Sequence, residues 1–280
     1  MERIGVVAKG DISMRDNIPG ISVIMGVFNA ENSVERSIQS IVDQTFTNWE
    51  FIICDDGSID NTLQILRKYE ADPRFRIIKN DKNMGLGAAL NNCIRYSKGQ
   101  FLARQDADDY SNPDRLERQL GYLEENKHIT VLGTQISLFD SEGNHWGINT
   151  PISPDDPWEW VKGSKVVHAS VLMRSDFIKK IGGYDSSAIR AEDHEMWIRV
   201  LSNKGVIETI PEVLYNVYWD WLDYKRKHLR FRLVEIRVFL KGLKIFKINR
   251  LKSLYVIKYI LASIIPASFL FYLHRKRFTK

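Results

Sequence analysis

Two closely spaced carboxylates, Asp106 and Asp108, follow an apolar segment at residues 101–104 of this 280-residue sequence. Carboxylates at positions i and i+2 beyond a strand can share one hard cation, and Mg²⁺ or Mn²⁺ prefers such oxygen ligands together with substrate phosphates. A cation held there could neutralise a diphosphate as it leaves a substrate. The alternative is a polar turn in which Asp109 or Asn112 caps the next helix. The position directly after an apolar segment strengthens the metal interpretation, and both stay open at this point.

A second acidic pair, Asp55 and Asp56, follows the apolar segment at residues 51–54. Gly57 permits a tight turn there, and Ser58 can cap the helix that follows. These turn functions do not account for two adjacent acids at a strand end. A carboxylate in this position could accept the imide N–H of a uracil or hydrogen-bond a ribose. The pair is therefore a candidate nucleotide contact.

Residues 83–90 look at first like a glycine-rich dinucleotide-binding loop. The segment follows the third predicted strand instead of the first, and Leu90 stands where that motif has its last glycine. We interpret it as a loop that leads into a helix N-terminus. The free backbone N–H groups of such a terminus can still face a phosphate.

The elements that must position these loops follow from the apolar pattern, in which strands and helices alternate. Such alternation predicts an α/β fold with a parallel, helix-covered sheet, and ligands of such sheets bind outside the carboxyl ends of the strands. Both acidic pairs would lie there. We expect a loop-rich insertion at residues 137–160. The predicted strands cover residues 21–27, 51–54, 75–78, 101–104, 130–134, 166–173 and 206–210, and the predicted helices begin near residues 34, 61, 86, 113 and 192.

The net charge of +5 conceals a basic C-terminal part and an acidic body. Residues 225–280 contain sixteen Lys or Arg and one acid, Glu235, whereas residues 1–224 contain 24 basic and 34 acidic residues. A basic tail on an acidic body indicates an anionic surface as partner. Because the body is a poor platform for nucleic acid, we expect lipid and no nucleic acid. Cys54 and Cys93 are too few for a disulfide scaffold and are predicted to be reduced core thiols.

Two segments of the tail could meet a membrane. Residues 230–247 alternate basic and apolar side chains in the manner of an amphipathic helix on anionic lipid, and the alternative is a basic face packed against the acidic body. Residues 259–273 form an uncharged run of fifteen residues, short of the roughly 20 that span a bilayer. We expect in-plane or re-entrant association. With no signal peptide at the N-terminus, we place the protein on the cytoplasmic face of a membrane.

The ordered set of motifs resembles the glycosyltransferase 2 family, inverting sugar-nucleotide-dependent enzymes with the GT-A fold. The resemblance covers residues 20 to 215, and it divides the chain into a leader (1–19), a GT-A domain (20–220) and a helical tail (221–280). The matching stretches are Ile21–Asn29, Ile38–Ile41, Gln44–Phe46, Phe51–Thr62, Asn83–Leu86, Ala103–Asp109, Pro113–Leu116, His168–Val171, Gly182–Asp185 and Ala191–Trp197.

The resemblance implies a role for each matching side chain. Asp193 would be the general base that takes the proton from the acceptor hydroxyl, a poor nucleophile at neutral pH. Asp108, together with Asp106, would bind Mn²⁺ or Mg²⁺. For the pair at 192–193 the alternative is two acids facing a helix dipole, and for His168 it is a satisfied core residue. The residues expected to bind the nucleotide or the sugar are Phe28, Asn29, Glu31, Asp55, Asp56, Asn83, Arg104, Asp106, His168 and Glu192.

The chain departs from the family pattern in two places. Many relatives carry Arg-x-His after the strand near Tyr215, and residues 214–221 lack it. The Gln-x-x-Arg-Trp of processive synthases is also absent, so we expect transfer of one sugar per encounter. The implied function is transfer from a UDP-linked donor to a glycan or lipid-linked saccharide in bacterial polysaccharide assembly. The alternatives are a nucleotidyltransferase, which would need a basic loop at residues 26–31, and a non-catalytic membrane-tethered module.

Overall fold

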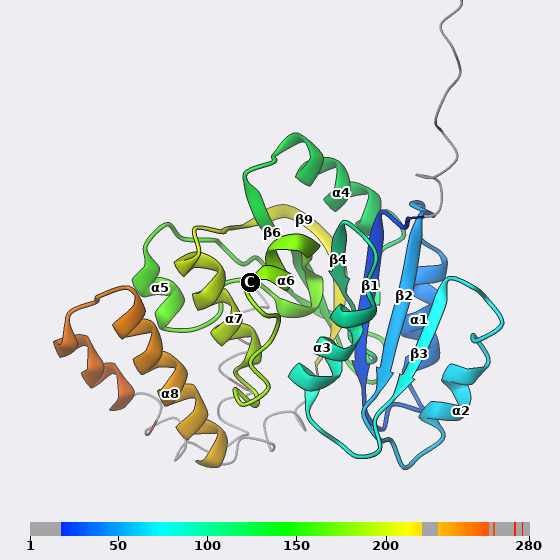
Figure 1. The fold of residues 1–280 in the computed structure, drawn as a ribbon, viewed down its shortest axis with the longest axis horizontal. Helices are drawn as coiled ribbons and strands as arrows, with labels where there is room; N and C mark the ends of the chain where they lie inside the picture. Colours follow the sequence, from blue (N-terminus) through cyan, green and yellow to red (C-terminus); the bar gives the residue numbers. More distant parts are fainter. Residues whose placement is uncertain (1–17, 220–228, 258–259, 261–271, 273–275, 277–280) are drawn as a thin grey trace, which may run out of the picture.

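A computed structural model of the chain describes residues 18–219, 229–257, 260, 272 and 276. Its strands form one mixed sheet with helices on both faces (Figure 1), so the predicted α/β class is confirmed. The strands are β1 (Ile21–Val27), β2 (Trp49–Asp55), β3 (Phe75–Lys79), β4 (Phe101–Arg104), β5 (Tyr110–Ser111), β6 (Ile129–Phe139), β7 (His145–Asn149), β8 (Leu172–Arg174) and β9 (Val206–Tyr218).

The sheet has a parallel half and a mixed half. Its order is β3-β2-β1-β4-β8-β6-β9-β5, with β7 paired to β6. The first four strands are parallel, whereas β8 is antiparallel to both β4 and β6, and β9 is parallel to β6. The helices are α1 (Val34–Val42), α2 (Thr62–Arg67), α3 (Leu86–Tyr96), α4 (Arg115–Glu125), α5 (Pro157–Val161), α6 (Ser175–Lys180), α7 (Glu192–Ser202) and α8 (Leu229–Ile245), with 3₁₀ helices η1 (His168–Ser170) and η3 (Arg250–Tyr255).

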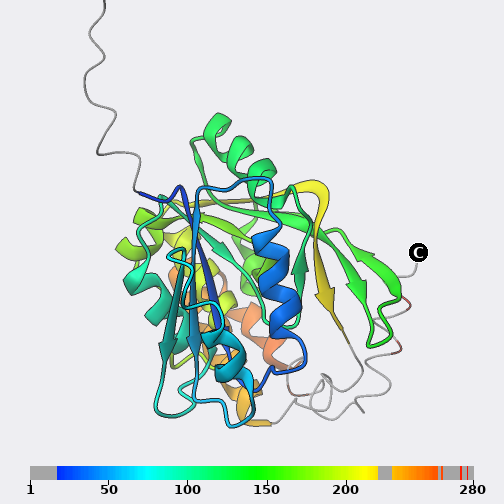
Figure 2. The same ribbon diagram turned by 90° about the vertical axis from the view of Figure 1, so that its right-hand side faces the viewer.

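The two faces of the sheet bury separate cores. In β1 the alternation of side chains sends Val23 and Met25 to the face covered by α1, α2 and α4, and Ile24 to the face covered by α3, α6 and α7. Figure 2 shows α1 on the first of these faces. Burial on both sides explains why the parallel strands read as continuous apolar runs. Cys54 and Cys93 are buried and unpaired on the second face, as predicted.

The region expected to be a loop-rich insertion, residues 137–160, has loops at 140–144 and 150–156 but holds more secondary structure than predicted. It contains the end of β6, the hairpin strand β7 and the helix α5. The helix begins at Pro157, and Asp156 caps it by accepting the N–H of Trp158 (2.9 Å). Two further differences concern predicted strands. Residues 166–173 hold η1 before the short β8, and the final strand extends to Tyr218.

The helix α8 packs onto the body of the protein. Val238, Phe239 and Leu243 are buried against α5 and α7. None of the helices in the described part of the chain is long and apolar enough to cross a membrane. The predicted leader, apart from residues 18 and 19, and most of the apolar run 259–273 lie outside the described residues.

Candidate active site

The carboxyl ends of β1, β2 and β4 meet at one edge of the sheet. β1 pairs in parallel with both neighbours, and Val27 lies opposite Asp55 in the register. The N–H of Asp56 donates to the carbonyl of Val27 (2.8 Å), which keeps the two strand ends together. The loops at residues 28–31 and 105–109 therefore leave the sheet at the edge where a parallel sheet binds ligands.

A cavity of about 810 Å³ opens at this edge, bordered by the entrance to α3, the loop at residues 185–191, and α8. Four residues predicted to bind the donor line it, and they come from four separate parts of the chain. These four are Phe28, Asp56, Asn83 and Glu192. The other lining residues are Gly26, Val27, Met84, Gly85, Leu86, Gly87, Ala89, Asp185, Ser186, Ala188, Ile189, Arg190, Phe231 and Val234.

Asp55 and Asp56 are buried and hold the loops around them. Asp55 accepts the N–H of Ser58 (3.2 Å), which closes the turn after β2. Asp56 accepts the N–H groups of Met84 (3.0 Å) and Gly85 (2.8 Å) and so fixes the entrance to α3. Asp56 borders the cavity, whereas Asp55 is not among its lining residues. Their contacts with a uracil or a ribose stay predictions.

Asn29 and Glu31 connect the loop after β1 to the loop after β2. Asn29 has a left-handed backbone (φ 53°) and accepts the N–H of Ile59 (3.0 Å). Glu31 accepts both the backbone N–H (2.9 Å) and the side-chain amide (2.8 Å) of Asn61. The structure places both side chains in this connection and outside the lining of the cavity, so their predicted contact with the nucleotide stays a prediction.

The loop that carries Asp106 and Asp108 is fixed through its backbone. Ser37 donates to the carbonyl of Asp106 (2.6 Å), and Arg36 donates to the carbonyl of Asp108 (2.8 Å), so α1 fixes both residues. The hydroxyl of Tyr215 accepts the N–H of Asp106 (3.0 Å). Asp106 is half-buried and Asp108 is exposed. The predicted metal-binding carboxylates therefore stand on a backbone that is anchored at three points.

Negative charge is concentrated on this loop. Burial, followed by the charges of Asp108 and Asp106, raises the pKa of Asp109 well above its usual range. Arg104, which is fully buried, forms an ion pair with Asp106. No group of three or more His, Cys, Asp or Glu side chains in the described part of the chain could hold a metal ion. Two carboxylates can still suit Mg²⁺ or Mn²⁺ when substrate phosphates supply further oxygen ligands.

Behind the cavity, Tyr184 links the predicted residues of the sheet to those of α7. Its hydroxyl lies 2.7 Å from Nε2 of His168. Burial raises the pKa of Tyr184, Arg104 lowers it, and the carboxylates of Asp193 and Glu192 raise it further, so all these groups lie near one phenol. Burial and Arg104 lower the pKa of His168 well below its usual range. The structure thus places His168 half-buried beside Tyr184, and its predicted contact with the substrate stays a prediction.

Glu192 and Asp193 form the first turn of α7. Burial, and then the charge of Asp193, raises the pKa of Glu192 to about 7. One carboxylate oxygen of Glu192 is buried without a hydrogen-bond partner among the described residues. Gly87 at the start of α3 lies against Glu192, where an added Cβ would be 3.7 Å from that side chain. The beginnings of α3 and α7 therefore meet at the cavity. Asp193 is half-buried and is not among the residues that line the cavity, so its role as general base stays a prediction.

Sequence reasoning missed several residues that build the site. Tyr184 stands inside the Gly-Gly-Tyr-Asp motif, where its spacing from Asp193 could have drawn attention to it. Arg36 lies on the exposed face of a helix, and Phe231 lies in the segment assigned to the tail. No local pattern distinguishes these last two, because their roles depend on contacts across the fold.

Comparison with known proteins identifies relatives of the chain. A model of Glycosyl transferase family 2 matches residues 22–182. The putative glycosyltransferase EpsE of Bacillus subtilis (strain 168) is 34% identical over 263 residues, 92% of this chain and 94% of EpsE. The chondroitin synthase of Escherichia coli is 29% identical over 85% of this chain, which spans 35% of the synthase. The crystal structure of S. aureus TarS 1-349 in complex with UDP-GlcNAc has a TM-score of 0.66 and 19% identity, over 87% of this chain and 71% of TarS 1-349.

These matches agree with the geometry of the site. The family model covers more than half of the chain, and EpsE matches it over nearly its whole length. The likeness to TarS shows that the mixed sheet and its flanking helices form a GT-A fold. The protein therefore belongs to glycosyl transferase family 2 and is a glycosyltransferase of the GT-A fold.

Proposed function

We propose that the protein is an inverting glycosyltransferase that moves a sugar from a UDP-linked donor to a glycan or lipid-linked saccharide during polysaccharide biosynthesis. The family assignment supports sugar transfer over the nucleotidyltransferase alternative. TarS, whose fold the chain shares, has been crystallised with UDP-GlcNAc and with UDP. EpsE is named a putative glycosyltransferase, and the E. coli relative is named a chondroitin synthase.

One observation carries the proposal. The cavity at the carboxyl edge of the sheet collects Phe28, Asp56, Asn83 and Glu192, which the sequence had assigned to the donor from four separate motifs. A cavity of about 810 Å³ is within the size range of small-molecule sites. The anchored loop with Asp106 and Asp108 leaves the neighbouring strand β4 at the same edge.

The chemistry would use the carboxylates in different ways. Asp193 would accept the proton of the acceptor hydroxyl while that oxygen attacks the anomeric carbon from the side opposite the departing nucleotide, which inverts that centre. Asp108, with Asp106, would hold Mn²⁺ or Mg²⁺, and such a cation supplies charge neutralisation to a departing diphosphate. Arg104 holds Asp106 by an ion pair, so Asp108 is the carboxylate assigned as direct ligand.

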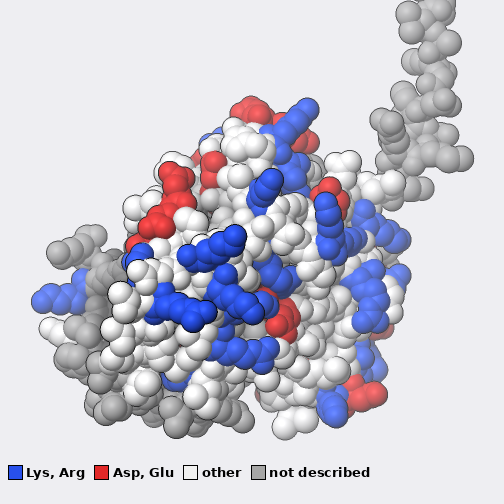
Figure 3. Space-filling model, turned by 60° about the vertical axis from the view of Figure 1, so that its left-hand side comes forward, with Lys and Arg blue, Asp and Glu red and all other residues white. Residues whose placement is uncertain are grey.

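The proposed place of action is the cytoplasmic face of a membrane. On α8 and η3 apolar side chains remain exposed, with Leu233 at 62%, Leu251 at 74% and Leu254 at 67%. Lys247, between the two elements, and Arg250, the first residue of η3, are also exposed. Figure 3 shows Lys and Arg side chains gathered on this side of the molecule. Exposed apolar groups among basic ones suit an anionic lipid surface, where a lipid-linked acceptor would also reside.

A donor screen tests the proposal. UDP- and GDP-sugars are incubated with the full-length protein and a lipid-linked acceptor extract, with Mn²⁺, Mg²⁺ or EDTA, and the released nucleoside diphosphate is measured. We expect release from a UDP-sugar that depends on the cation, and loss of transfer in Asp193→Asn with UDP binding retained. A parent protein that binds and consumes no nucleotide sugar would contradict the proposal. Equal turnover by Asp193→Asn would show that Asp193 is not the base.

A further inference from the structure

The C-terminal helix α8 contributes directly to the wall of the donor cavity. Phe231 and Val234, three positions apart on α8, line it together with Ile189 and Arg190 of the loop before α7. The same cavity is lined by Asp56 and by the entrance to α3. The site is therefore enclosed in part by a segment that follows the last strand of the sheet.

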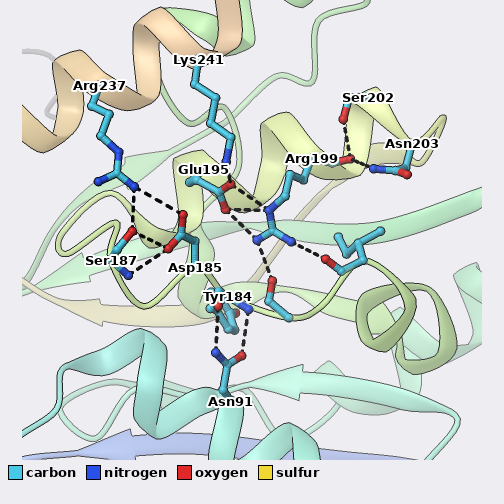
Figure 4. A network of polar contacts seen from close by, with 12 residues as sticks. Asn91, Tyr184, Asp185, Ser187, Glu195, Arg199, Ser202, Asn203, Arg237 and Lys241 are labelled. Atoms are coloured by element: carbon cyan, nitrogen blue, oxygen red, sulfur yellow. Dashed lines mark hydrogen bonds and ion pairs between the residues drawn. The ribbon is translucent and has the colours of Figure 1, made fainter. Parts of the chain in front are cut away.

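Polar contacts of two basic side chains hold α8 in this position (Figure 4). Lys241 donates to Glu195 of α7 (2.6 Å), a carboxylate whose side chain is 1% exposed and which also pairs with Arg199. Arg237 donates to the hydroxyl of Ser187 (2.7 Å) and lies 3.9 Å from the carboxylate of Asp185, a residue that lines the cavity. The helix α8 is thus attached both to α7, which begins with Glu192 and Asp193, and to the loop before α7.

Arg190 has two features that single it out on this wall. Its backbone is in the left-handed region (φ 63°), a conformation that is uncommon for a residue with a side chain and that recurs at functional sites. Its guanidinium lies over the ring of Phe231, 4.9 Å from the centroid. A cation is attracted to the face of an aromatic ring, so Phe231 orients Arg190 at the cavity.

The charge of Arg190 complements the ligand expected here. Among the described residues that line the cavity, Arg190 is the one with a cationic side chain, beside the carboxylates of Asp56, Asp185 and Glu192. A planar guanidinium presents several N–H donors to phosphate or carboxylate oxygens in a fixed geometry. Because the other charged side chains that line the cavity are acidic, an anionic ligand could form an ion pair there with Arg190.

We propose that Arg190, seated on Phe231 of α8, binds an anionic group of the sugar nucleotide, and that α8 thereby forms a donor-recognition wall. This inference rests on the proposed function. Two groups share the required chemistry, namely the diphosphate of any UDP-sugar and the carboxylate of an acidic sugar. The two groups are distinguished by which ligands lose affinity when the positive charge of Arg190 is removed by substitution.

The test measures binding of uridine, UDP, UDP-glucose and UDP-glucuronic acid to the full-length protein by calorimetry with Mn²⁺ present. In Arg190→Met we expect the affinity for UDP and both UDP-sugars to fall about tenfold or more, because a hydrogen bond to a charged group is lost, while uridine binding is unchanged. A loss confined to UDP-glucuronic acid would assign Arg190 to the sugar carboxylate. Unchanged affinity for all four ligands would overturn the proposal.

A second variant tests the part played by α8. Phe231→Leu keeps an apolar side chain, and we expect it to weaken UDP binding about threefold through loss of the ring beneath the guanidinium. Because Phe231 acts through Arg190, the double variant should bind UDP no more weakly than Arg190→Met alone. Additive losses would refute the pairing. Leu233→Ala, on the same helix but outside the cavity, is the matched control and should leave UDP binding unchanged. A parent protein that binds no UDP would refute the proposed function and not this inference alone.

Discussion

Replacing Glu192 by Gln should make the free energy of unfolding less dependent on pH. The carboxylate of Glu192 stands in the first turn of α7 beside Asp193, and one of its oxygens is buried without a partner among the described residues. Burial, and then the charge of Asp193, raises its pKa from 4.5 to about 7. Gln has nearly the same shape and cannot ionise, so it represents the protonated form at every pH.

The sign and size of the effect follow from proton linkage. Between pH 4.5 and 7 the unfolded chain has released the proton of Glu192 while the folded protein still holds it, so the free energy of unfolding falls as pH rises through this window. Each pKa unit corresponds to about 1.4 kcal/mol. Since Glu192 is half-buried and keeps some contact with solvent, we expect the parent to lose about 2 kcal/mol between pH 5 and pH 8 through this group.

Urea unfolding of both proteins at pH 5, 6, 7 and 8 measures the difference. The stability of Glu192→Gln relative to the parent should increase by about 2 kcal/mol from pH 5 to pH 8, with most of the change complete near pH 7. Glu124→Gln, at an exposed position of α4, is the control and should leave the pH dependence of the parent intact. A difference between Glu192→Gln and the parent that stays constant with pH would refute the reasoning.

Three further predictions concern metal binding, the attachment of α8 to α7, and membrane binding. Asp108→Asn should weaken binding of Mn²⁺ in the presence of UDP about tenfold or more, measured from the free-ion signal by electron paramagnetic resonance; an unchanged signal would remove Asp108 as ligand. Lys241→Met should lower the free energy of unfolding by about 1 kcal/mol, because Glu195 at 1% side-chain exposure keeps only Arg199 as ion-pair partner among the described residues; the unfolding midpoint in urea checks this. Replacing Leu251 and Leu254 by Ser should reduce co-sedimentation with vesicles containing anionic lipid. A parent protein that does not bind such vesicles would contradict the membrane proposal.

The sequence was sufficient for the parallel half of the fold and for the edge at which the site lies. β1, β2 and β4 are buried on both faces, so each appears as a short apolar run, and loops at their carboxyl ends must meet. Asp56, which lines the cavity from one of these loops, could therefore be found from its position at a strand end, whereas Phe28 came from resemblance to a family. Asn83 and Glu192 came from resemblance to a family, since Asn83 lies in the loop before α3 and Glu192 begins α7, and either could have had a purely structural role.

The remainder depends on contacts that local patterns do not encode. β7 pairs on one side with β6 and exposes Ile148 at 52%, so it lacks the apolar signal of a strand. Helix α5 has five residues, too few for a helical period to be visible. Phe231 lies in a helix whose basic and apolar residues also suit a lipid surface. Only the folded structure shows that this helix packs against α7 and also borders the cavity.

In both acidic motifs of the site, one of two adjacent carboxylates is buried away from the ligand-binding edge, and the other borders the cavity or is exposed. Adjacent carboxylates at a strand end repel each other, so placing one inside the protein and one toward solvent separates their charges. Asp109 is buried and accepts the N–H of Tyr218 (2.8 Å), whereas Asp108 is exposed. Asp55 is likewise buried in the turn after β2, beneath the residue that borders the cavity. Asp109 thus fixes the backbone that leaves Asp108 at the surface. At residues 55–56 both carboxylates are buried and both fix backbone N–H groups, and Asp56 also borders the cavity, where a ligand can reach it.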